Sequence, residues 1–393
     1  MNAALTDISA SLLEWLTGDF SHDQDLTGLL EGLGIRLRNA GIAIDRLVIH
    51  LLMIDPEILG RTLAWAPNEP VETLSRLHGF NVSPGGLKSP IRYSLETNTW
   101  LSLRVASPDA ADWFVHEVYL HRDLAERLYV PLMSGNTWIG VICFATAIPG
   151  GFSAEERSLF QRLLPAIRNS IELKALQERG ANLLDTYIGT ETGRRILAGH
   201  VQRGDVETIE AALMLCDLRD FTGLSNRLPE DRVLALLNSY FDQILPPITR
   251  HGGEVLKFIG DAVLVNFLIS DDPARNCQAA LDAAHDALAH LAQVHEPDAV
   301  LKAGISLHYG KASYGNIGSG HRLDFTVIGP DINLTSRIQG VCGTTGHSLL
   351  MSRRFADLSP QIQPVPAGHH VLKGFAEPVE LFTLDADWLA AVS

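Results

Sequence analysis

The chain has 393 residues, which is enough for two or three domains at ~100–200 residues each, and 46 % of them are hydrophobic, as in a globular protein. Its formal net charge of -15 argues against nucleic acid as a partner, because phosphate backbones bind clustered lysine and arginine. Apolar runs such as LVIHLLMI fall far short of the ~20 residues that span a bilayer, so we expect no membrane partner.

The cysteines and the N-terminus bear on the cellular compartment. Cys143, Cys216, Cys277 and Cys342 lie far apart in the sequence, so we expect neither a zinc site nor a redox motif. The N-terminal stretch has no basic region and acidic residues interrupt it early, which is unlike a signal peptide. We therefore expect a reduced, soluble, cytoplasmic protein.

Residues 1–175 have the pattern of one mixed domain. Helical spacing over residues 25–41 ends on Gly41, and strand-like runs follow at 45–54 and 60–66. Residues 126–146 read as two strands around a turn at Ser134-Gly135-Asn136.

A long helix is predicted over residues 153–180, with a capping box formed by Ser153 and Glu156. Its apolar residues recur at spacings of three and four and give one buried stripe. The residues of this stripe are Phe160, Leu163, Leu164, Ile167 and Ile171.

The order of helix, antiparallel strands and closing helix resembles a GAF domain. The segment WIGVICFATAIPGGFSAEERSLFQRLL is similar to the last strand and exit helix of that family. The resemblance implies either a sensor that binds a small molecule or a dimerisation scaffold without a ligand. Both interpretations remain open.

His116 and His121 invite a haem or metal interpretation. If residues 112–128 form a helix, five residues turn the chain by ~500°, and the two rings lie ~140° apart. We therefore do not expect them to share a ligand.

Residues 176–206 are polar and read as a helical linker broken at Gly189 and Gly199. From residue 207 the pattern changes to an α+β domain, with helices on one face of an antiparallel sheet. The expected order is a strand entering a helix at 209–224, a helix at 229–252, a hairpin at 253–267, a helix at 271–295, a hairpin at 301–318, a strand at 321–329 and a short helix at 331–339.

Two carboxylates punctuate this domain. Asp217 lies where the first strand ends, and Asp261 lies at the tip of the 253–267 hairpin. If that strand lies beside the hairpin, the two acids meet, and a cation would relieve their repulsion. Carboxylate oxygens suit Mg²⁺, whose shell phosphate oxygens often complete. Taken alone, however, a Gly-Asp pair also suits a tight turn without function.

A helix starts near Phe221 and Thr222, directly after Asp217. The free backbone N–H groups of a helix N-terminus bind anions. A metal site beside such an N-terminus predicts a triphosphate site.

Residues 207–385 resemble the catalytic domain of class III nucleotidyl cyclases. The matching stretches are DLRDFTGLS, LNSYFDQILPPITRHGGEVLKFIGDAVLVNF, DFTVIGPDINLTSRI and LKGFAEPVELFTL. The resemblance implies a ferredoxin-like antiparallel sheet with helices and an active site formed between two protomers of a homodimer.

It also implies roles for individual residues. Asp217 and Asp261 would hold two Mg²⁺ or Mn²⁺ ions, Asn333 would orient the ribose, and Arg337 would stabilise charge on the α-phosphate. In the alternative, Asn333 is a helix cap and Arg337 a surface residue.

Lys257 and Thr326 occupy the base-reading positions of that family. A lysine only donates hydrogen bonds, which suits adenine N1 and not the protonated guanine N1, whereas a threonine hydroxyl serves either base. Lysine with threonine resembles a bacterial adenylyl cyclase variant, although many relatives carry aspartate at the second position.

One further residue departs from the family pattern, and two more are candidate triphosphate contacts. Asp220 replaces a glycine of many relatives and adds negative charge near the phosphate loop, which the sequence does not explain. Arg322 and Lys373 either contact the triphosphate or lie on solvated surface.

The sequence thus predicts a sensor-regulated adenylyl cyclase that converts ATP to cyclic AMP and pyrophosphate as a homodimer. The alternatives are a guanylyl cyclase and a non-catalytic protein that keeps the fold and senses a ligand.

Overall fold

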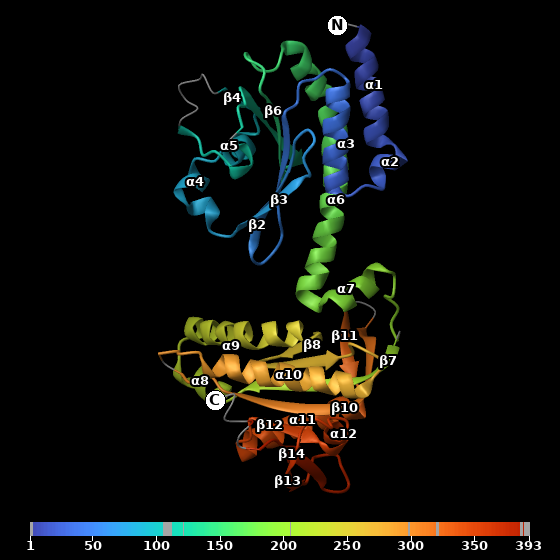
Figure 1. The fold of residues 1–393 in the computed structure, drawn as a ribbon, viewed down its shortest axis with the longest axis vertical. Helices are drawn as coiled ribbons and strands as arrows, with labels where there is room; N and C mark the ends of the chain where they lie inside the picture. The colour runs from blue at the N-terminus through green and yellow to red at the C-terminus, as the bar shows by residue number, and fades with distance from the viewer. Residues whose placement is uncertain are drawn as a thin grey trace. The chain divides into compact units, whose positions relative to one another are not determined.

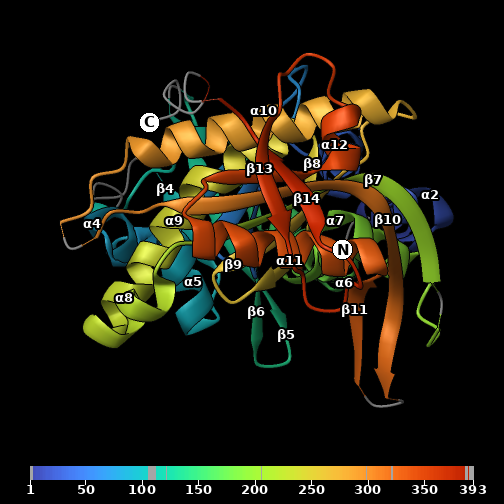
Figure 2. The same cartoon turned by 90° about the horizontal axis from the view of Figure 1, so that it is seen from below.

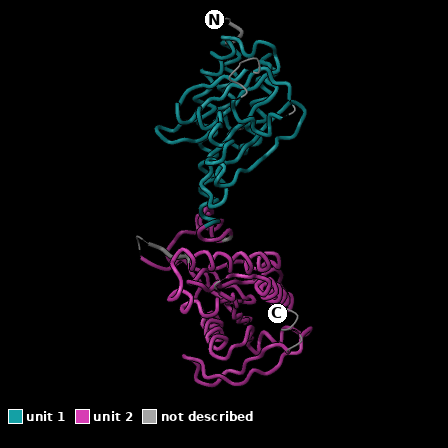
Figure 3. The backbone as a smooth tube through the Cα atoms, turned by 90° about the vertical axis from the view of Figure 1, so that its left-hand side faces the viewer, with its two compact units in different colours: residues 1–186 teal, residues 187–393 magenta. Residues whose placement is uncertain are grey.

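The computed structural model divides the chain into two compact units, residues 1–186 and 187–393, coloured separately in Figure 3. Each unit mixes helices and strands, as Figure 1 shows. The described residues are 3–104, 112–120, 122–204, 206–297, 299–319, 322–385 and 388.

The N-terminal unit is built on an antiparallel sheet with the strand order β3-β2-β1-β6-β5-β4. The strands predicted at 45–54, 60–66 and 126–146 are confirmed as β1, β2 and the β5–β6 hairpin. The sequence did not indicate β3 or β4. The strands are β1 (Arg46–Leu52), β2 (Ile58–Trp65), β3 (Glu72–Leu77), β4 (Leu101–Arg104), β5 (Glu126–Ser134) and β6 (Thr137–Thr146).

Helices α3 and α6 cover one face of this sheet (Figure 1). The predicted capping box is present, since the Ser153 amide donates to Glu156 Oε2 (2.8 Å) and the Glu156 amide donates to Ser153 Oγ (3.2 Å). Of the predicted apolar stripe, all but the partly buried Leu164 are buried against the sheet. The helices of this layer are α1 (Ala3–Thr17), α2 (Asp19–His22), α3 (Leu26–Asn39) and α6 (Ala154–Ile188).

The opposite face of the sheet carries a second, smaller core together with short helical segments. Alternate residues of β1 separate the two cores, because Leu47 and Ile49 face α3 and α6 while Val48 faces the other side. The segments on this side are η1 (Phe80–Val82), α4 (Pro84–Leu87), α5 (Pro90–Thr97) and η3 (Glu117–Tyr119).

The two glycine breaks expected between residues 176 and 206 are present. Helix α6 ends at Ile188, α7 spans Thr190–Leu197, and Gly189 and Gly199 both have positive φ angles, of 87° and 94°. Glycine adopts this conformation without the steric cost that other residues incur.

The C-terminal unit contains a sheet with the order β13-β14-β12-β10-β7-β9-β8, and β11 pairs with β10. The hairpin expected at 301–318 is wrong: these residues form one long strand, β10, whose hairpin partner is β11 (Figure 2). The strands are β7 (Val206–Leu218), β8 (Gly253–Ile259), β9 (Ala262–Phe267), β10 (Ala303–Ser319), β11 (Arg322–Ile328), β12 (Leu349–Ser352), β13 (Val365–His370) and β14 (Val379–Thr383).

Gly310 explains why β10 continues where a turn was expected. A Cβ atom at Gly310 would lie 2.4 Å from Asp331 Oδ2, so the glycine admits close approach of α11 and does not mark a turn. The sheet is also not purely antiparallel, because β10 and β12 run parallel.

Helices cover both faces of this sheet, and the expectation of helices on one face is therefore wrong. Helices α9 and α10 pack over the main core, whereas α11 packs Ile338 and Cys342 against Leu350 and Leu381 on the other side. The helices are α8 (Phe221–Arg227), α9 (Glu230–Arg250), α10 (Pro273–Ala292), α11 (Pro330–Thr345) and α12 (Arg353–Asp357).

Among the described residues, no helix combines the length and the apolar character that crossing a bilayer requires.

Candidate active site

Asp217 and Asp261 meet at one end of the C-terminal sheet. Asp217 is the second-last residue of β7 and is paired in register with Ala262, the residue that follows Asp261. The preceding Gly260 has a φ of 66°, which lets the β8–β9 turn place Asp261 beside β7. The predicted proximity of the two acids is present.

The Asp217 carboxyl group has a raised pKa. Burial, a hydrogen bond with Asp261 and the negative charge of Asp261 raise the pKa of Asp217 to about 7. Two carboxylates held this close are stabilised by a cation between them, and their oxygens are ligands that Mg²⁺ and Mn²⁺ accept. The donor set thus fits a divalent metal.

The protein supplies only part of a metal coordination shell at this site. Within the described ranges, no group of three or more His, Cys, Asp or Glu side chains is arranged to hold an ion. Two carboxylates leave coordination positions for the oxygens of a substrate, as is usual for Mg²⁺ at phosphate sites.

Lys257 and Thr326 are brought together although β8 and β11 are far apart in sequence. Lys257 Nζ donates to Thr326 Oγ1 at 3.4 Å, and both side chains are half-buried. The pair combines three N–H donors of an ammonium group with a hydroxyl that both donates and accepts.

Asn333 and Arg337 lie on α11, four residues apart and thus on the same helix face. Both side chains are exposed. Neither side chain has a hydrogen bond or ion pair within the part of the chain that the structure describes, so neither side chain caps the helix there.

The start of α11 is held by Asp331, which the sequence analysis did not single out. Asp331 Oδ2 accepts from the Lys311 amide (2.7 Å), and Oδ1 lies 3.3 Å from Nε2 of the buried His308. His308 Nδ1 in turn contacts Ser352 Oγ at 2.7 Å. The signal was the acid after Gly-Pro at a helix start, two residues before Asn333.

Helix α8 follows directly after Asp217. Phe221 is its first residue and packs against the main core, while Thr222 is exposed. The preceding Asp220 adopts the left-handed conformation, with φ 57° and ψ 25°, and pairs with Arg227 at 3.2 Å. This backbone explains the preference for glycine at the position.

The last two residues predicted as possible triphosphate contacts are Lys373 and Arg322. Lys373 is exposed in the segment between β13 and β14. Arg322 is the first residue of β11, opposite Ser319, and its side chain lies outside the described residues.

The segment with His116 and His121 is not the helix considered above. Its described residues include the short 3-10 helix η3, whose N-cap is His116. The side chain of His116 is buried, whereas His121 lies outside the described residues.

The C-terminal part of the chain is similar to known proteins. Residues 205–385 match the family model of the adenylate and guanylate cyclase catalytic domain. Adenylate cyclase 1 of Rhizobium meliloti is 26 % identical over 249 residues, which cover 61 % of this chain and 36 % of that protein. An adenylate cyclase of Anabaena cylindrica is 29 % identical over 162 residues, which cover 39 % of this chain and 31 % of that protein.

A solved structure of a bacterial light-regulated adenylyl cyclase has a TM-score of 0.48 and 25 % identity, over 58 % of this chain and 68 % of that chain. The chain spans only about a third of the length of the two curated relatives named above.

Proposed function

We propose that this chain, whose residues 205–385 form an adenylate/guanylate cyclase catalytic domain, converts ATP to 3′,5′-cyclic AMP and pyrophosphate. The observation that carries the proposal is the meeting of Asp217 and Asp261 at one sheet end inside this domain. The names of the two curated relatives reported above, both adenylate cyclases, support ATP as the substrate.

Asp217 and Asp261 would hold two Mg²⁺ or Mn²⁺ ions. When bound, such ions lower the pKa of the ribose 3′-hydroxyl and neutralise the triphosphate. The carboxylates would hold these ions at the end of β7, and α8, which starts with Phe221 and Thr222, begins four residues after Asp217.

Lys257 and Thr326 would read the base. Lys257 Nζ donates to adenine N1, and Thr326 Oγ1 accepts from the adenine amino group. Guanine carries a hydrogen at N1 and would leave the lysine without an acceptor at that position, which favours ATP.

Asn333 and Arg337 would act on the ribose and the α-phosphate. Asn333 orients the ribose so that its 3′-oxygen attacks the α-phosphorus in line, while the hydroxyl proton passes to solvent. The bond from the α-phosphorus to the bridging oxygen breaks, and pyrophosphate leaves with that electron pair. Arg337 stabilises the negative charge that builds on the α-phosphate oxygens.

A complete site would require two copies of the chain. Lys257 lies on β8, two residues before the strand ends, whereas Asp261 lies in the turn between β8 and β9, so the base-reading pair and the acidic pair occupy different positions on one hairpin. In a two-fold dimer, one protomer would supply Asp217 and Asp261, and the other would supply Lys257, Thr326, Asn333 and Arg337.

The N-terminal unit would serve as a GAF-like regulatory or dimerisation domain, covering residues 1–175, with residues 176–206 as a helical transducer in a cytoplasmic protein. Its sheet topology and its two-sided core support a compact, separately folding module.

The test is to incubate the purified chain with ATP or GTP, in the presence of Mg²⁺ or Mn²⁺, and to identify the product by mass spectrometry. Cyclic AMP is expected. Formation of cyclic GMP alone would establish the guanylyl cyclase alternative. No cyclic product from either nucleotide would favour a non-catalytic sensor.

A further inference from the structure

The N-terminal unit contains a cavity of about 550 Å³ between the sheet and the segment that carries η1, α4 and α5. This volume lies within the ~300–1,000 Å³ that small-molecule sites occupy. Val82 and Trp138 line it and are 72 % and 43 % exposed, so the cavity reaches the surface. Its apolar lining includes Leu52, Met53, Leu59, Phe80, Ile91 and Leu95.

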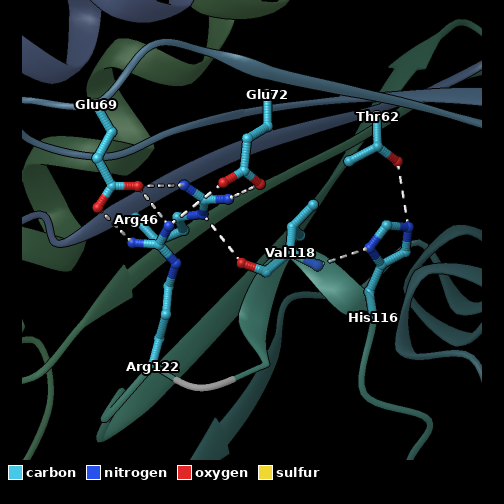
Figure 4. A network of polar contacts seen from close by, with 7 residues as sticks. All are labelled: Arg46, Thr62, Glu69, Glu72, His116, Val118 and Arg122. Atoms are coloured by element: carbon cyan, nitrogen blue, oxygen red, sulfur yellow. Dashed lines mark hydrogen bonds and ion pairs between the residues drawn. The ribbon is translucent and has the colours of Figure 1, made fainter.

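Two histidines in the wall, His50 and His116, have rings 5.0 Å apart. The Val118 amide donates to His116 Nδ1 (3.4 Å), so neutral His116 carries its proton on Nε2 and donates it to Thr62 Oγ1 (3.4 Å; Figure 4). The Thr62 hydroxyl then donates to His50 Nδ1 (2.9 Å). His50 Nε2–H donates to the Tyr119 hydroxyl (3.1 Å).

This directed chain of hydrogen bonds uses all four ring nitrogens of the two histidines. Burial keeps the rings neutral, because it lowers the pKa of His116 to about 4 and that of His50 well below its usual value. The histidines therefore contribute neither charge nor a spare hydrogen-bonding nitrogen to the cavity.

Arg76 on β3 is one of the three arginines that line the cavity. Its Nη2 donates to Glu117 Oε2 at 2.7 Å, and its guanidinium carbon lies 4.9 Å from the ring centre of Phe80. Its Nε–H is shielded from solvent and has no hydrogen-bond partner among the described residues. A buried donor without an acceptor destabilises the free protein, and an acceptor on a ligand would remove this cost.

The other charged residues of the lining are compensated or directed elsewhere. Arg92 and Glu96 both line the cavity and form an ion pair on α5 at 2.7 Å. Arg61 also has a buried Nε–H without a hydrogen-bond partner among the described residues, but its Nη2 pairs with Glu178 on α6, which packs on the opposite face of the sheet. Among the described residues, the ion-pair partner of Arg76 is Glu117. The Glu117 side chain is 52 % exposed, so solvent screens its charge.

We propose that this cavity binds a small organic carboxylate, with an apolar body against the leucine, isoleucine and phenylalanine side chains and a carboxylate that accepts from Arg76. A guanidinium group has donors only, so an ammonium or another cation is excluded there. The apolar lining, and the carboxylates that already pair with Arg61, Arg76 and Arg92, favour one carboxylate over a phosphate with two charges. The proposal concerns the N-terminal unit and does not depend on the cyclase activity.

The test measures binding to the full chain by isothermal titration calorimetry. The probes are 2-naphthoate, octanoate and decanoate, with 2-naphthamide as the neutral match of 2-naphthoate. We expect at least one carboxylate to bind with a one-to-one stoichiometry. We expect 2-naphthamide to bind at least about tenfold more weakly than 2-naphthoate. No binding by any of the three carboxylates, or equal binding of naphthoate and naphthamide, would overturn the proposal.

Two substitutions locate the site. Arg76→Gln should weaken carboxylate binding at least about tenfold and leave naphthamide unchanged, whereas Arg38→Gln, which removes an arginine paired with Asp45 away from the cavity, should change neither. Equal affinities in the two variants would overturn the role of Arg76. Ile91→Trp, which fills the cavity, should abolish binding of both probes, and undiminished binding would place the probes elsewhere. The comparison of carboxylate with amide on the unaltered chain stands even if a variant does not fold.

Discussion

The carboxyl groups of Asp217 and Asp261 share the end of one sheet, because the register of β7 and β9 sets Asp217 opposite the residue that follows Asp261. Neither carboxylate belongs to a larger cluster of metal-ligating side chains in the described ranges. In the proposed metal site, each acid would therefore be indispensable for holding a cation.

Asp261→Asn should therefore abolish cyclisation while leaving the fold intact. The amide keeps the shape of the side chain but removes half of the anionic charge that the pair offers. We expect the rate to fall by more than the ~10–100-fold typical for loss of a group that only supports a metal ligand. The measurement is cyclic AMP formation at saturating Mn²⁺, with Asp271→Asn, an exposed acid before α10, as the control. Near wild-type activity of Asp261→Asn would refute the metal assignment.

Lys257→Glu should lower ATP turnover sharply and narrow the preference for ATP over GTP. A glutamate accepts a hydrogen bond from guanine N1–H, which the lysine cannot do. The measurement is the ratio of kcat/KM for the two nucleotides, because a general loss of folded protein lowers both values equally. An unchanged ratio would show that Lys257 does not read the base.

Asp220→Gly should give a more stable protein than Asp220→Ala, by about 1 kcal/mol. Both variants lose the exposed contact with Arg227, so their difference isolates the left-handed backbone at φ 57°. Chemical denaturation monitored by circular dichroism measures the difference. Equal stability of the two variants would mean that this backbone conformation carries no strain.

His116 should make the N-terminal unit less stable in mild acid. Its pKa of about 4 lies below that of an unfolded histidine, at ~6.5. Between these two pH values, the histidine binds a proton in the unfolded chain but not in the folded protein. The stability it contributes is complete above pH ~6.5 and is lost as the pH falls towards 4. The neighbouring groups are His50, whose pKa is also lowered, and the charged Arg76 and Glu117.

Urea denaturation of His116→Gln at pH 7 and pH 5 tests this account. About 2 kcal/mol of the wild-type loss between these pH values should be absent from the variant. His78→Gln, which replaces an exposed histidine of the same unit, serves as the control and should behave as the wild type. An equal loss in all three proteins would rule out His116 as the source.

Local signals in the sequence predicted much of this structure. The Ser153–Glu156 capping box and the Gly260–Asp261 turn depend on residues a few positions apart, so a pattern suffices to find them. Gly310 was misleading, since its role is to admit Asp331 from another element. The sequence did not predict which face of the sheet α11 covers, because the buried face of α11 mixes polar Thr335 and Gln339 with apolar Ile338.

The same limit applies to the sites. The acids at the two strand ends could be paired from the expected order of elements, and the cyclase resemblance indicated Lys257 and Thr326. The contact between these two residues, which lie on β8 and β11, is a tertiary fact. The N-terminal cavity was not predictable, because it depends on Arg76 in a strand that the sequence did not reveal.

The central claim is that Asp217 and Arg337 act in one active site supplied by two protomers, and mixing two inactive variants tests it most directly. Asp217→Ala and Arg337→Ala should each be inactive alone. Co-expressed with free mixing, about half of the dimers contain one copy of each, and in these one site has both defects and the other has none. The account predicts a return of cyclic AMP formation to about a quarter of the wild-type rate. Verified mixed dimers that remain inactive, or activity in either variant alone, would contradict it.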